Sequence, residues 1–298
     1  MSTELPDAHA GDARKDPAGT STGKAPTPVL DVTGLDVHYG SRRRRRKALH
    51  GISLSVAPGE TVGVIGETGS GKSTLARAVL GLVRPSAGSV VIDGEDVTRH
   101  GSRQWRGLRR RGVVQYVFQD PLRSLDPDLT IEESLSEPLL IQGTARREAA
   151  ERVRGVLARV RLTEDLLDRL PGELSGGQRQ RAAVARALVT EPRLLLLDEP
   201  VSALDSANRV QILRILKGLR ADGVALVFIS HDLGSVAGTA DRIAVLYRGE
   251  LVETGPARDV ISRPQHPYTR LLVSSAPTLR GASVDRAERD KLRTLLHA

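Results

Sequence analysis

Apolar residues from position 29 onward fall into short runs with two different periods. Runs in which apolar and polar residues alternate, or in which every residue is apolar, predict strands. These strand-like runs are 29–39, 52–56, 61–65, 88–93, 113–118, 194–197, 224–229, 243–247 and 250–253. Helical periodicity occurs at 75–82, from 130 to about 170, from about 175 to 188 and at 206–219. Strands that alternate with helices in this order predict an α/β fold.

The order of these elements predicts the domain organisation. The first two strands should form a small antiparallel sheet ahead of the third. The helical stretch after residue 130 has little strand character, so we expect a separate helical lobe at about 122–182 within a domain at 28–277. Residues 1–27 are rich in Ala, Gly, Pro and Thr without periodicity and are predicted to be a disordered tail. Residues 278–298 would be a C-terminal extension.

Composition excludes several classes of protein. The 298 residues are 39% hydrophobic, which is enough to bury a core, but no stretch approaches the roughly 20 apolar residues that span a bilayer. The N-terminus has no apolar segment of the kind that directs secretion. Without cysteine, the chain can form neither a disulfide nor a thiolate-held zinc or iron–sulfur cluster. We therefore expect a cytoplasmic protein whose membrane contacts are peripheral.

The formal net charge of +8 is concentrated in two blocks of basic residues. One block runs from Arg42 to Lys47, and the other comprises Arg103, Arg106, Arg109, Arg110 and Arg111. Either block could contact nucleic acid or anionic lipid headgroups. Trp105 is the only aromatic residue within them, so platforms for stacking bases are poorly supported. We expect solvated basic loops and no nucleic-acid partner.

Residues 66–74, Gly-Glu-Thr-Gly-Ser-Gly-Lys-Ser-Thr, carry the strongest chemical signal. Gly66 and Gly71, followed by a lysine and a serine, have the spacing of a loop that binds phosphates. The loop lies between a predicted strand and a predicted helix, whose N-terminus adds a favourable dipole for anions. Lys72 would then contact the β and γ phosphates of a nucleotide, and the Ser73 hydroxyl would hold Mg²⁺. An ordinary glycine turn before a helix is the alternative.

Polar residues come directly after three of the apolar runs. These residues are Gln119, the pair Asp198 and Glu199, and His231. At the ends of buried strands, such residues usually face a ligand crevice. One of two adjacent carboxylates could approach Mg²⁺ while its neighbour polarises water. The alternatives are a capping role for Gln119, solubilisation for the two acids and a surface position for His231.

Two more features could bind a nucleotide. Ser175 precedes Gly176 and Gly177 at the start of a predicted helix, which makes a second helix terminus able to receive an anion. A plain helix cap is the alternative there. Tyr39 ends the first predicted strand and could stack on a nucleotide base, but a core tyrosine is equally compatible with its position.

Taken together, these motifs resemble the nucleotide-binding subunit of an ABC transporter, in the family's order and over nearly everything from 29 to about 277. The resemblance implies a P-loop NTPase (RecA-like) core with an N-terminal antiparallel β-subdomain and an inserted helical subdomain. It makes Tyr39 the aromatic residue that stacks on adenine, Gln119 the Q-loop glutamine and Leu194 to Asp198 the Walker B strand. Glu199 would be the catalytic carboxylate and His231 the switch histidine.

The same resemblance implies which residues bind ATP and Mg²⁺. Three motifs would supply the nucleotide contacts: the signature sequence, which is Leu174 to Gln178, the D-loop, which contains Asp205, and the phosphate loop. Their contact residues would be Gly66, Gly69, Ser70, Gly71, Lys72, Ser73, Thr74, Ser175, Gly176, Gly177, Gln178 and Asp205. Ser73, Gln119 and Asp198 would arrange Mg²⁺ and its waters. Glu199 would deprotonate the attacking water while His231 contacts the γ-phosphate. Ser175 and Gly177 would close over ATP held by a partner subunit.

A narrower resemblance is to the oligopeptide/dipeptide/nickel importer branch. It rests on Phe118 to Pro121, on the Ser124-Leu125 pair with Pro127, and on the tail from Pro264 to Thr269. Within that branch the chain looks like the second of two paired ATPases. Some relatives carry an iron–sulfur cluster in the C-terminal region, which this cysteine-free chain cannot hold.

The branch implies three kinds of partner. These are a second ATPase subunit, transmembrane permease subunits with a helix in a groove beside Gln119, and, indirectly, an extracytoplasmic solute-binding protein. We therefore expect an ATPase at the cytoplasmic face of the membrane that energises uptake of peptides or a related small solute such as nickel. A soluble ABC ATPase acting on nucleic acid or ribosomes, or the ATPase of an exporter, are the alternatives.

Overall fold

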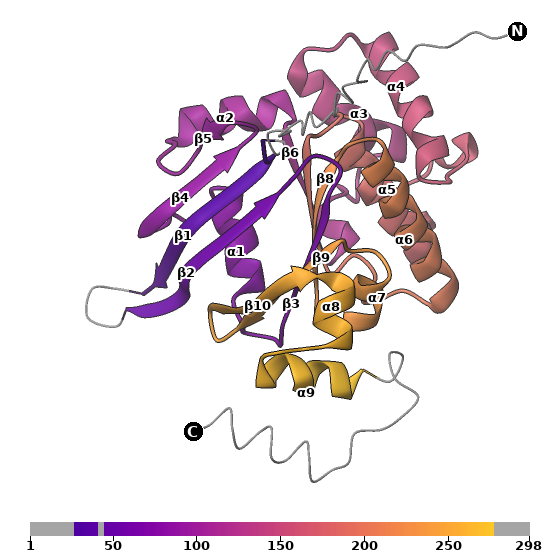
Figure 1. The fold of residues 1–298 in the computed structure, drawn as a ribbon. Coiled ribbons are helices and arrows are strands. Elements are labelled where there is room, and N and C mark those ends of the chain that lie inside the picture. The colour runs from indigo at the N-terminus through magenta and orange to yellow at the C-terminus, as the bar shows by residue number, and fades with distance from the viewer. Residues whose placement is uncertain (1–26, 41–44, 277–298) are drawn as a thin grey trace, which may run out of the picture.

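The fold has two β-sheets with helices packed between and around them (Figure 1). The computed structural model describes residues 27–40 and 45–276. The strands are β1 (Leu30–Tyr39), β2 (Arg46–Val56), β3 (Thr61–Ile65), β4 (Ala87–Ile92), β5 (Glu95–Asp96), β6 (Val114–Val117), β7 (Leu194–Asp198), β8 (Ala225–Ser230), β9 (Arg242–Tyr247) and β10 (Glu250–Pro256). Residues 1–26 of the tail expected at 1–27, the first three residues of the first basic block (42–44) and the extension at 278–298 lie outside the described residues.

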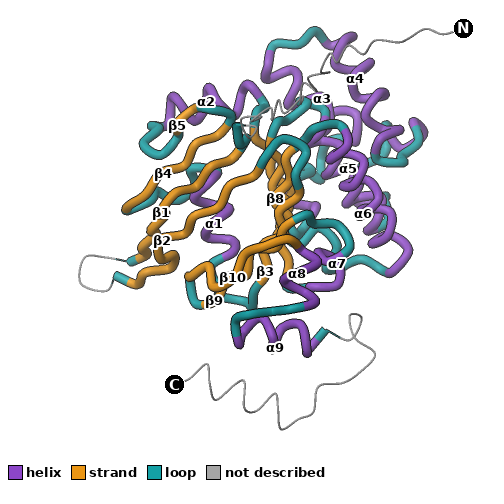
Figure 2. The backbone as a smooth tube through the Cα atoms, in the orientation of Figure 1, coloured by secondary structure: helices purple, strands orange, loops and turns teal. Residues whose placement is uncertain are grey.

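Helices follow most of these strands. They are α1 (Lys72–Val79), α2 (Ser102–Arg111), α3 (Ile131–Gln142), α4 (Arg146–Arg159), α5 (Gly176–Leu188), α6 (Ser206–Ala221), α7 (Leu233–Ala237), α8 (Ala257–Ser262) and α9 (Pro267–Ser275). Figure 2 shows α3 and α4 at one end of the molecule and α8 and α9 at the opposite end. Within the described residues, no helix combines the length and the apolar character needed to cross a lipid bilayer.

The smaller sheet is antiparallel, with strand order β2-β1-β4-β5. Buried and partly exposed residues alternate at the start of β1, because successive side chains point to opposite faces of a strand. The larger sheet has the order β10-β9-β3-β8-β7-β6 and is parallel except for β10. This confirms the α/β fold with an antiparallel sheet ahead of the parallel one.

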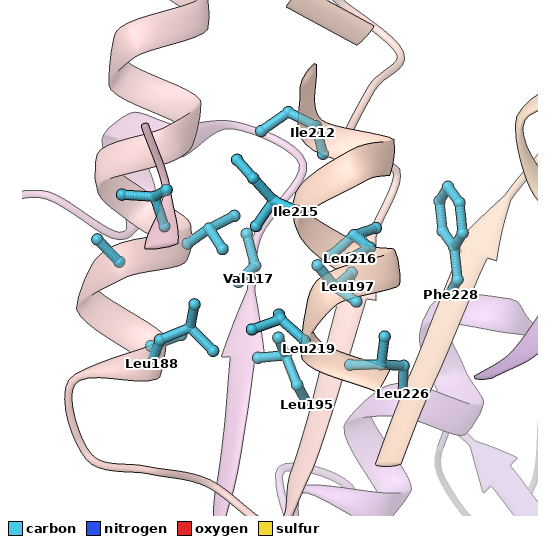
Figure 3. Close-up of a cluster of buried hydrophobic side chains, with 14 of the residues drawn as sticks. Val117, Leu188, Leu195, Leu197, Ile212, Ile215, Leu216, Leu219, Leu226 and Phe228 are labelled. Atoms are coloured by element: carbon cyan, nitrogen blue, oxygen red, sulfur yellow. The ribbon is translucent and has the colours of Figure 1, made fainter. Parts of the chain in front are cut away.

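The parallel sheet is buried on both faces, which explains why β7 and β8 are apolar up to their last residues, Asp198 and Ser230. Alternate residues of β7 enter two different cores. Leu195 and Leu197 pack with α5 and α6 on one face (Figure 3), while Leu194 and Leu196 pack with α1 and the antiparallel sheet on the other. Helix α1 is therefore enclosed between the two sheets, and the loop that precedes it is fixed at a sheet edge.

The predicted helical stretch consists mainly of α3 and α4, followed by two single turns of 3₁₀ helix. Thr130 caps α3 by accepting a hydrogen bond from the backbone N–H of Glu133, whose carboxylate accepts one from the N–H of Thr130. This capping box starts the helix at Ile131, directly after residue 130, where the helical stretch was expected to begin. Buried residues of both helices join the core beside α5.

The expectation of two solvated basic loops was wrong for the described residues. Arg103 to Arg111 lie on α2, because Trp105 and Leu108, three residues apart, bury one face of a helix and leave the arginines on the others. At the first block, β2 already begins at Arg46 and pairs with β1. Lys47 forms an ion pair with Asp36 at 2.9 Å.

Replacing Gly81, which follows α1, by alanine should destabilise the fold strongly. Gly81 has φ 67°, and a Cβ there would lie 1.9 Å from an atom of the Trp105 ring. Left-handed backbone and overpacking together should lower the free energy of unfolding by about 2–4 kcal/mol. The matched control is Gly94→Ala, at φ 79° with no atom within 4 Å of the added Cβ, which should cost about 1 kcal/mol. Urea unfolding followed by circular dichroism measures both, and equal losses would contradict this packing argument.

Candidate active site

The predicted phosphate loop connects the end of β3 to the start of α1. The helix begins at Lys72, three residues earlier than expected, because Gly71 serves as its N-cap. Gly71 has φ 112°, a conformation that side-chain-bearing residues rarely adopt, and a Cβ there would meet Leu49 at 2.8 Å. The glycine at this position is thus required by both backbone geometry and space.

The loop forms one wall of a cleft of about 1020 Å³. Most of the predicted nucleotide and metal residues line it, together with residues that the sequence did not indicate. The lining residues are Tyr39, Arg46, Lys47, Ala48, Thr68, Gly69, Gly71, Lys72, Ser73, Thr74, Gln119, Asp198, Glu199, His231, Arg248 and Gly249. Tyr39 is 39% exposed, so it is not a core residue. Its position permits stacking on a base.

Lys72 is held over its own loop. Its ammonium donates hydrogen bonds to the carbonyl oxygens of Gly66 at 2.6 Å and Glu67 at 2.9 Å. Burial lowers the pKa of Lys72, and the nearby carboxylates of Glu199, Asp198 and Glu67 act in the opposite direction. A bound phosphate would likewise favour the charged form, so nucleotide binding and protonation of Lys72 support each other.

Asp198, at the end of β7, is positioned by two hydroxyl groups. Its Oδ2 atom accepts a hydrogen bond from Tyr116 at 2.7 Å, and the Ser73 hydroxyl lies 3.5 Å from the same oxygen. Tyr116 lies on β6, and its ring packs edge-on against Phe118 at 4.6 Å. Sequence reasoning missed Tyr116. The only available signal was its place two residues before the end of the strand predicted at 113–118.

The donors around Ser73 suit a magnesium ion. Mg²⁺ prefers oxygen ligands and usually takes one or two carboxylates together with substrate phosphates and water. Ser73, Asp198 and Gln119 offer such oxygens beside the phosphate loop. In the described parts of the chain, no three His, Cys, Asp or Glu side chains gather into an all-protein metal site. An ion that also uses phosphate oxygens fits this donor set.

Glu199 also lines the cleft, and two neighbouring side chains contact its carboxylate. Its Oε1 lies 2.8 Å from Nδ1 of His231, and its Oε2 accepts a hydrogen bond from the Gln119 amide at 3.2 Å. Since an ionised carboxylate only accepts hydrogen bonds, Nδ1 of His231 carries the proton in this arrangement. Gln119, Glu199 and His231 follow β6, β7 and β8, which are neighbours in the parallel sheet. The three residues that follow these strands therefore lie together, as the sequence predicted.

The backbone of Glu199 is also unusual. Its φ is 48°, in the left-handed region that glycine prefers, and its N–H donates to the carbonyl of Ile229 on β8 at 2.9 Å. Strained backbone of this kind concentrates at functional sites, where the surrounding structure holds it. A carboxylate fixed by two side chains and a strained backbone can accept a proton from a water molecule placed between it and a phosphate.

The signature residues lie elsewhere. Ser175 caps α5 by accepting from the N–H of Gln178, whose side chain accepts from the N–H of Ser175. A Cβ on Gly177 would lie 2.0 Å from the Asn208 side chain, and Asn208 in turn donates to Asp205, the N-cap of α6. Those bonds to Asn208 lower the pKa of Asp205.

Several predicted nucleotide contacts do not line the cleft. They are Ser175, Gly176, Gly177, Gln178 and Asp205, and also Gly66 and Ser70 within the phosphate loop. Ser70 is buried, and its carbonyl accepts a hydrogen bond from the N–H of Gly249 at 2.8 Å. The sequence suggested that Ser175 and Gly177 would serve a nucleotide held by another subunit. Their position outside the lining of this chain's own cleft is compatible with that prediction.

Two family models match parts of this chain. A model of the family described as ABC transporter matches residues 49–202, and one described as the oligopeptide/dipeptide transporter C-terminal region matches residues 252–295. A protein of Brucella ovis whose name describes peptide import and ATP binding is 47% identical over 254 residues, which is 85% of this chain and 80% of that protein.

Two further matches extend the comparison. The oligopeptide transport ATP-binding protein OppF of Escherichia coli K12 is 41% identical over 261 residues, covering 84% of this chain and 78% of OppF. A dimeric ATP-binding cassette solved in a post-hydrolysis state, bound to ADP and Pi, superposes with a TM-score of 0.70. It is 31% identical and covers 77% of this chain and 99% of that one.

Proposed function

Because this chain belongs to the ABC transporter family of ATP-binding proteins, we propose that it is the ATPase subunit that energises peptide uptake through a separate membrane permease. One observation carries the proposal. The phosphate loop and the Glu199 carboxylate share a single cleft, in a chain whose C-terminal region matches that of oligopeptide/dipeptide transporters. The name of the Brucella ovis relative refers to import, which argues against the exporter alternative.

We propose that Lys72 and the backbone N–H groups of Gly69 to Thr74 hold the phosphates of ATP at the N-terminus of α1. Two of the three ammonium hydrogens of Lys72 are donated to the carbonyl oxygens of Gly66 and Glu67, and the third would be donated to a phosphate oxygen. Tyr39, exposed at the cleft mouth, would stack on the adenine base. Ser73, Asp198 and Gln119 would hold Mg²⁺, whose charge offsets that of the phosphates.

Hydrolysis would depend on Glu199. Its carboxylate accepts the proton of the attacking water, and His231, fixed by its bond to Glu199, contacts the γ-phosphate. Because Gln119 and His231 both donate to this carboxylate, their movement would change its orientation and hence turnover. ATP bound here would be closed over by Ser175 and Gly177 of a second ATPase subunit, so that hydrolysis separates the pair.

The permease contact is proposed for a second cleft, of about 830 Å³, between α2 on one side and α3 and α5 on the other. The residues that line this cleft include Trp105, Pro138 and Ile141 together with the arginines Arg84, Arg106, Arg109, Arg110 and Arg186. A permease segment with acidic and apolar side chains would complement it. Gln115 of β6 lines this cleft, and Gln119 follows the end of the same strand, which connects the cleft to the ATP site. The protein would thus work peripherally, at the cytoplasmic face of the membrane.

Peptide uptake by a strain that lacks this chain tests the proposal. We expect uptake of a labelled oligopeptide to fall to background, to return with the wild-type chain, and to stay at background with the Glu199→Gln chain at equal abundance. Normal uptake in the deletion strain would overturn the importer assignment. Salt-sensitive binding of nucleic acid by the purified chain would instead favour a soluble ABC ATPase that acts on nucleic acid.

A further inference from the structure

The C-terminal helix α9 reaches the phosphate loop through one buried side chain. Tyr268, the second residue of α9, is 1% exposed, and its hydroxyl accepts a hydrogen bond from the backbone N–H of Glu67 at 2.7 Å. The two residues are 201 positions apart in the chain. Tyr268 does not line the nucleotide cleft, so it touches the loop from behind.

The peptide unit between Gly66 and Glu67 is held at both ends. Its carbonyl, that of Gly66, accepts from the Lys72 ammonium at 2.6 Å, and its N–H, that of Glu67, donates to Tyr268. Rotation of this peptide would break both bonds and would move a carbonyl partner of Lys72. The Tyr268 hydroxyl thereby fixes the part of the loop whose carbonyl oxygens hold the Lys72 ammonium.

Tyr268 is itself rigidly placed. Its ring packs on Tyr247 of β9, with centroids 4.2 Å apart and an angle of 32° between the planes. Burial raises the pKa of Tyr268 to about 12, so the hydroxyl is neutral at physiological pH. An un-ionised phenol at this position keeps a neutral hydrogen bond to the loop.

The start of α9 is tied down as well. The Glu253 carboxylate on β10 accepts from the N–H groups of Gln265 and His266, each at 2.9 Å. His266 caps the helix through its Nδ1, which accepts from the N–H of Tyr268 at 3.2 Å. The helix therefore cannot shift along the sheet edge without breaking these bonds, and the phosphate loop rests on a fixed support.

We propose that Tyr268 is a positioning residue for ATP binding, acting through the Gly66–Glu67 peptide and Lys72. The inference rests on the proposed function and adds to it a role for the C-terminal region in shaping the nucleotide site. It predicts that the Tyr268 hydroxyl affects the affinity for MgATP more than the rate at saturation. The reason is that Tyr268 contacts the loop after β3, whereas Gln119, Glu199 and His231 follow β6, β7 and β8.

Tyr268→Phe and the matched control Tyr247→Phe test this role, since each variant loses one hydroxyl from the same ring pair. In the full chain with MgATP, we expect Tyr268→Phe to raise the Kd and the KM about three- to tenfold, with kcat within about twofold of wild type. Tyr247→Phe should leave all three values within about twofold, because its hydroxyl makes no bond to the loop in the described structure. Unchanged affinity in Tyr268→Phe, or an equal loss in Tyr247→Phe, would overturn the proposal.

Hydrogen exchange at the Glu67 amide separates this proposal from the proposed function. Without nucleotide, exchange at Glu67 should be faster in Tyr268→Phe than in wild type and unchanged in Tyr247→Phe. Equal exchange in all three proteins would show that the contact does not hold the loop. Failure of the wild-type chain to bind or hydrolyse MgATP would refute the ATPase assignment, while the exchange experiment would still report on the contact.

Discussion

Replacing Glu199 by glutamine is expected to leave MgATP bound while lowering the rate of hydrolysis by about a hundredfold to ten-thousandfold. The substitution keeps the size of the side chain, but an amide cannot accept the proton of the attacking water. Lys72 and the phosphate loop line the same cleft, and the hydrogen bonds of Lys72 to the loop do not involve Glu199. The affinity for MgATP should therefore stay near the wild-type value in this variant while the rate of hydrolysis falls.

Phosphate release under saturating MgATP and nucleotide affinity, both measured on the purified chain with its partners, provide the test. Glu151→Gln is the matched control, because Glu151 is an exposed carboxylate on α4 paired only with Arg147 in the described structure. A Glu199→Gln protein with near-normal turnover would refute the assignment of Glu199 as the base. A variant that loses ATP binding as well would show that Glu199 mainly supports the cleft.

Gly177→Ala should reduce turnover about a hundredfold, although Gly177 lies outside the cleft of its own chain. A Cβ at this position would lie 2.0 Å from Asn208, so Asn208 must move away from Asp205 and disturb the surface that includes Ser175. If that surface closes over the ATP of a second subunit, closure fails while the affinity of the isolated chain for MgATP stays unchanged.

The matched control is Gly172→Ala, in the turn just before the same helix, where an added Cβ has no atom within 4 Å. We expect this control to hydrolyse ATP at the wild-type rate. Weaker MgATP binding by an isolated Gly177→Ala chain would place the effect in its own cleft. Normal turnover by Gly177→Ala would remove the signature residues from the mechanism.

The sequence predicted the shared cleft because parallel strands bring their carboxyl ends to one edge. Gln119, Glu199 and His231 each follow an apolar run, and the neighbouring positions of β6, β7 and β8 place them within hydrogen-bonding distance. Local signals were also sufficient for the phosphate loop and for the capped start of α3. These features depend on the periodicity of neighbouring residues and on residue types, such as glycine in a tight loop, that few other residues can replace.

Features that depend on contacts between distant residues were not predictable in the same way. Nothing near Tyr268 in the sequence indicates that its hydroxyl meets Glu67, and nothing near Tyr116 shows that it faces Asp198. Helix α2 was not predicted because its only buried apolar residues are Trp105 and Leu108. Two apolar residues at helical spacing, surrounded by arginines, are too weak a periodic signal to indicate a helix. Tertiary packing, not local preference, decides these three features.

We propose that this chain supplies half of a two-subunit ATP site. Sedimentation of the Glu199→Gln chain, mixed with the second ATPase of its transporter, measures the mass of the protein with and without MgATP. We expect separate subunits without nucleotide and one species with the mass of two ATPase subunits when MgATP is present, and Gly177→Ala should abolish that species. A mass that does not change with MgATP, at concentrations where nucleotide is bound, would refute the shared site.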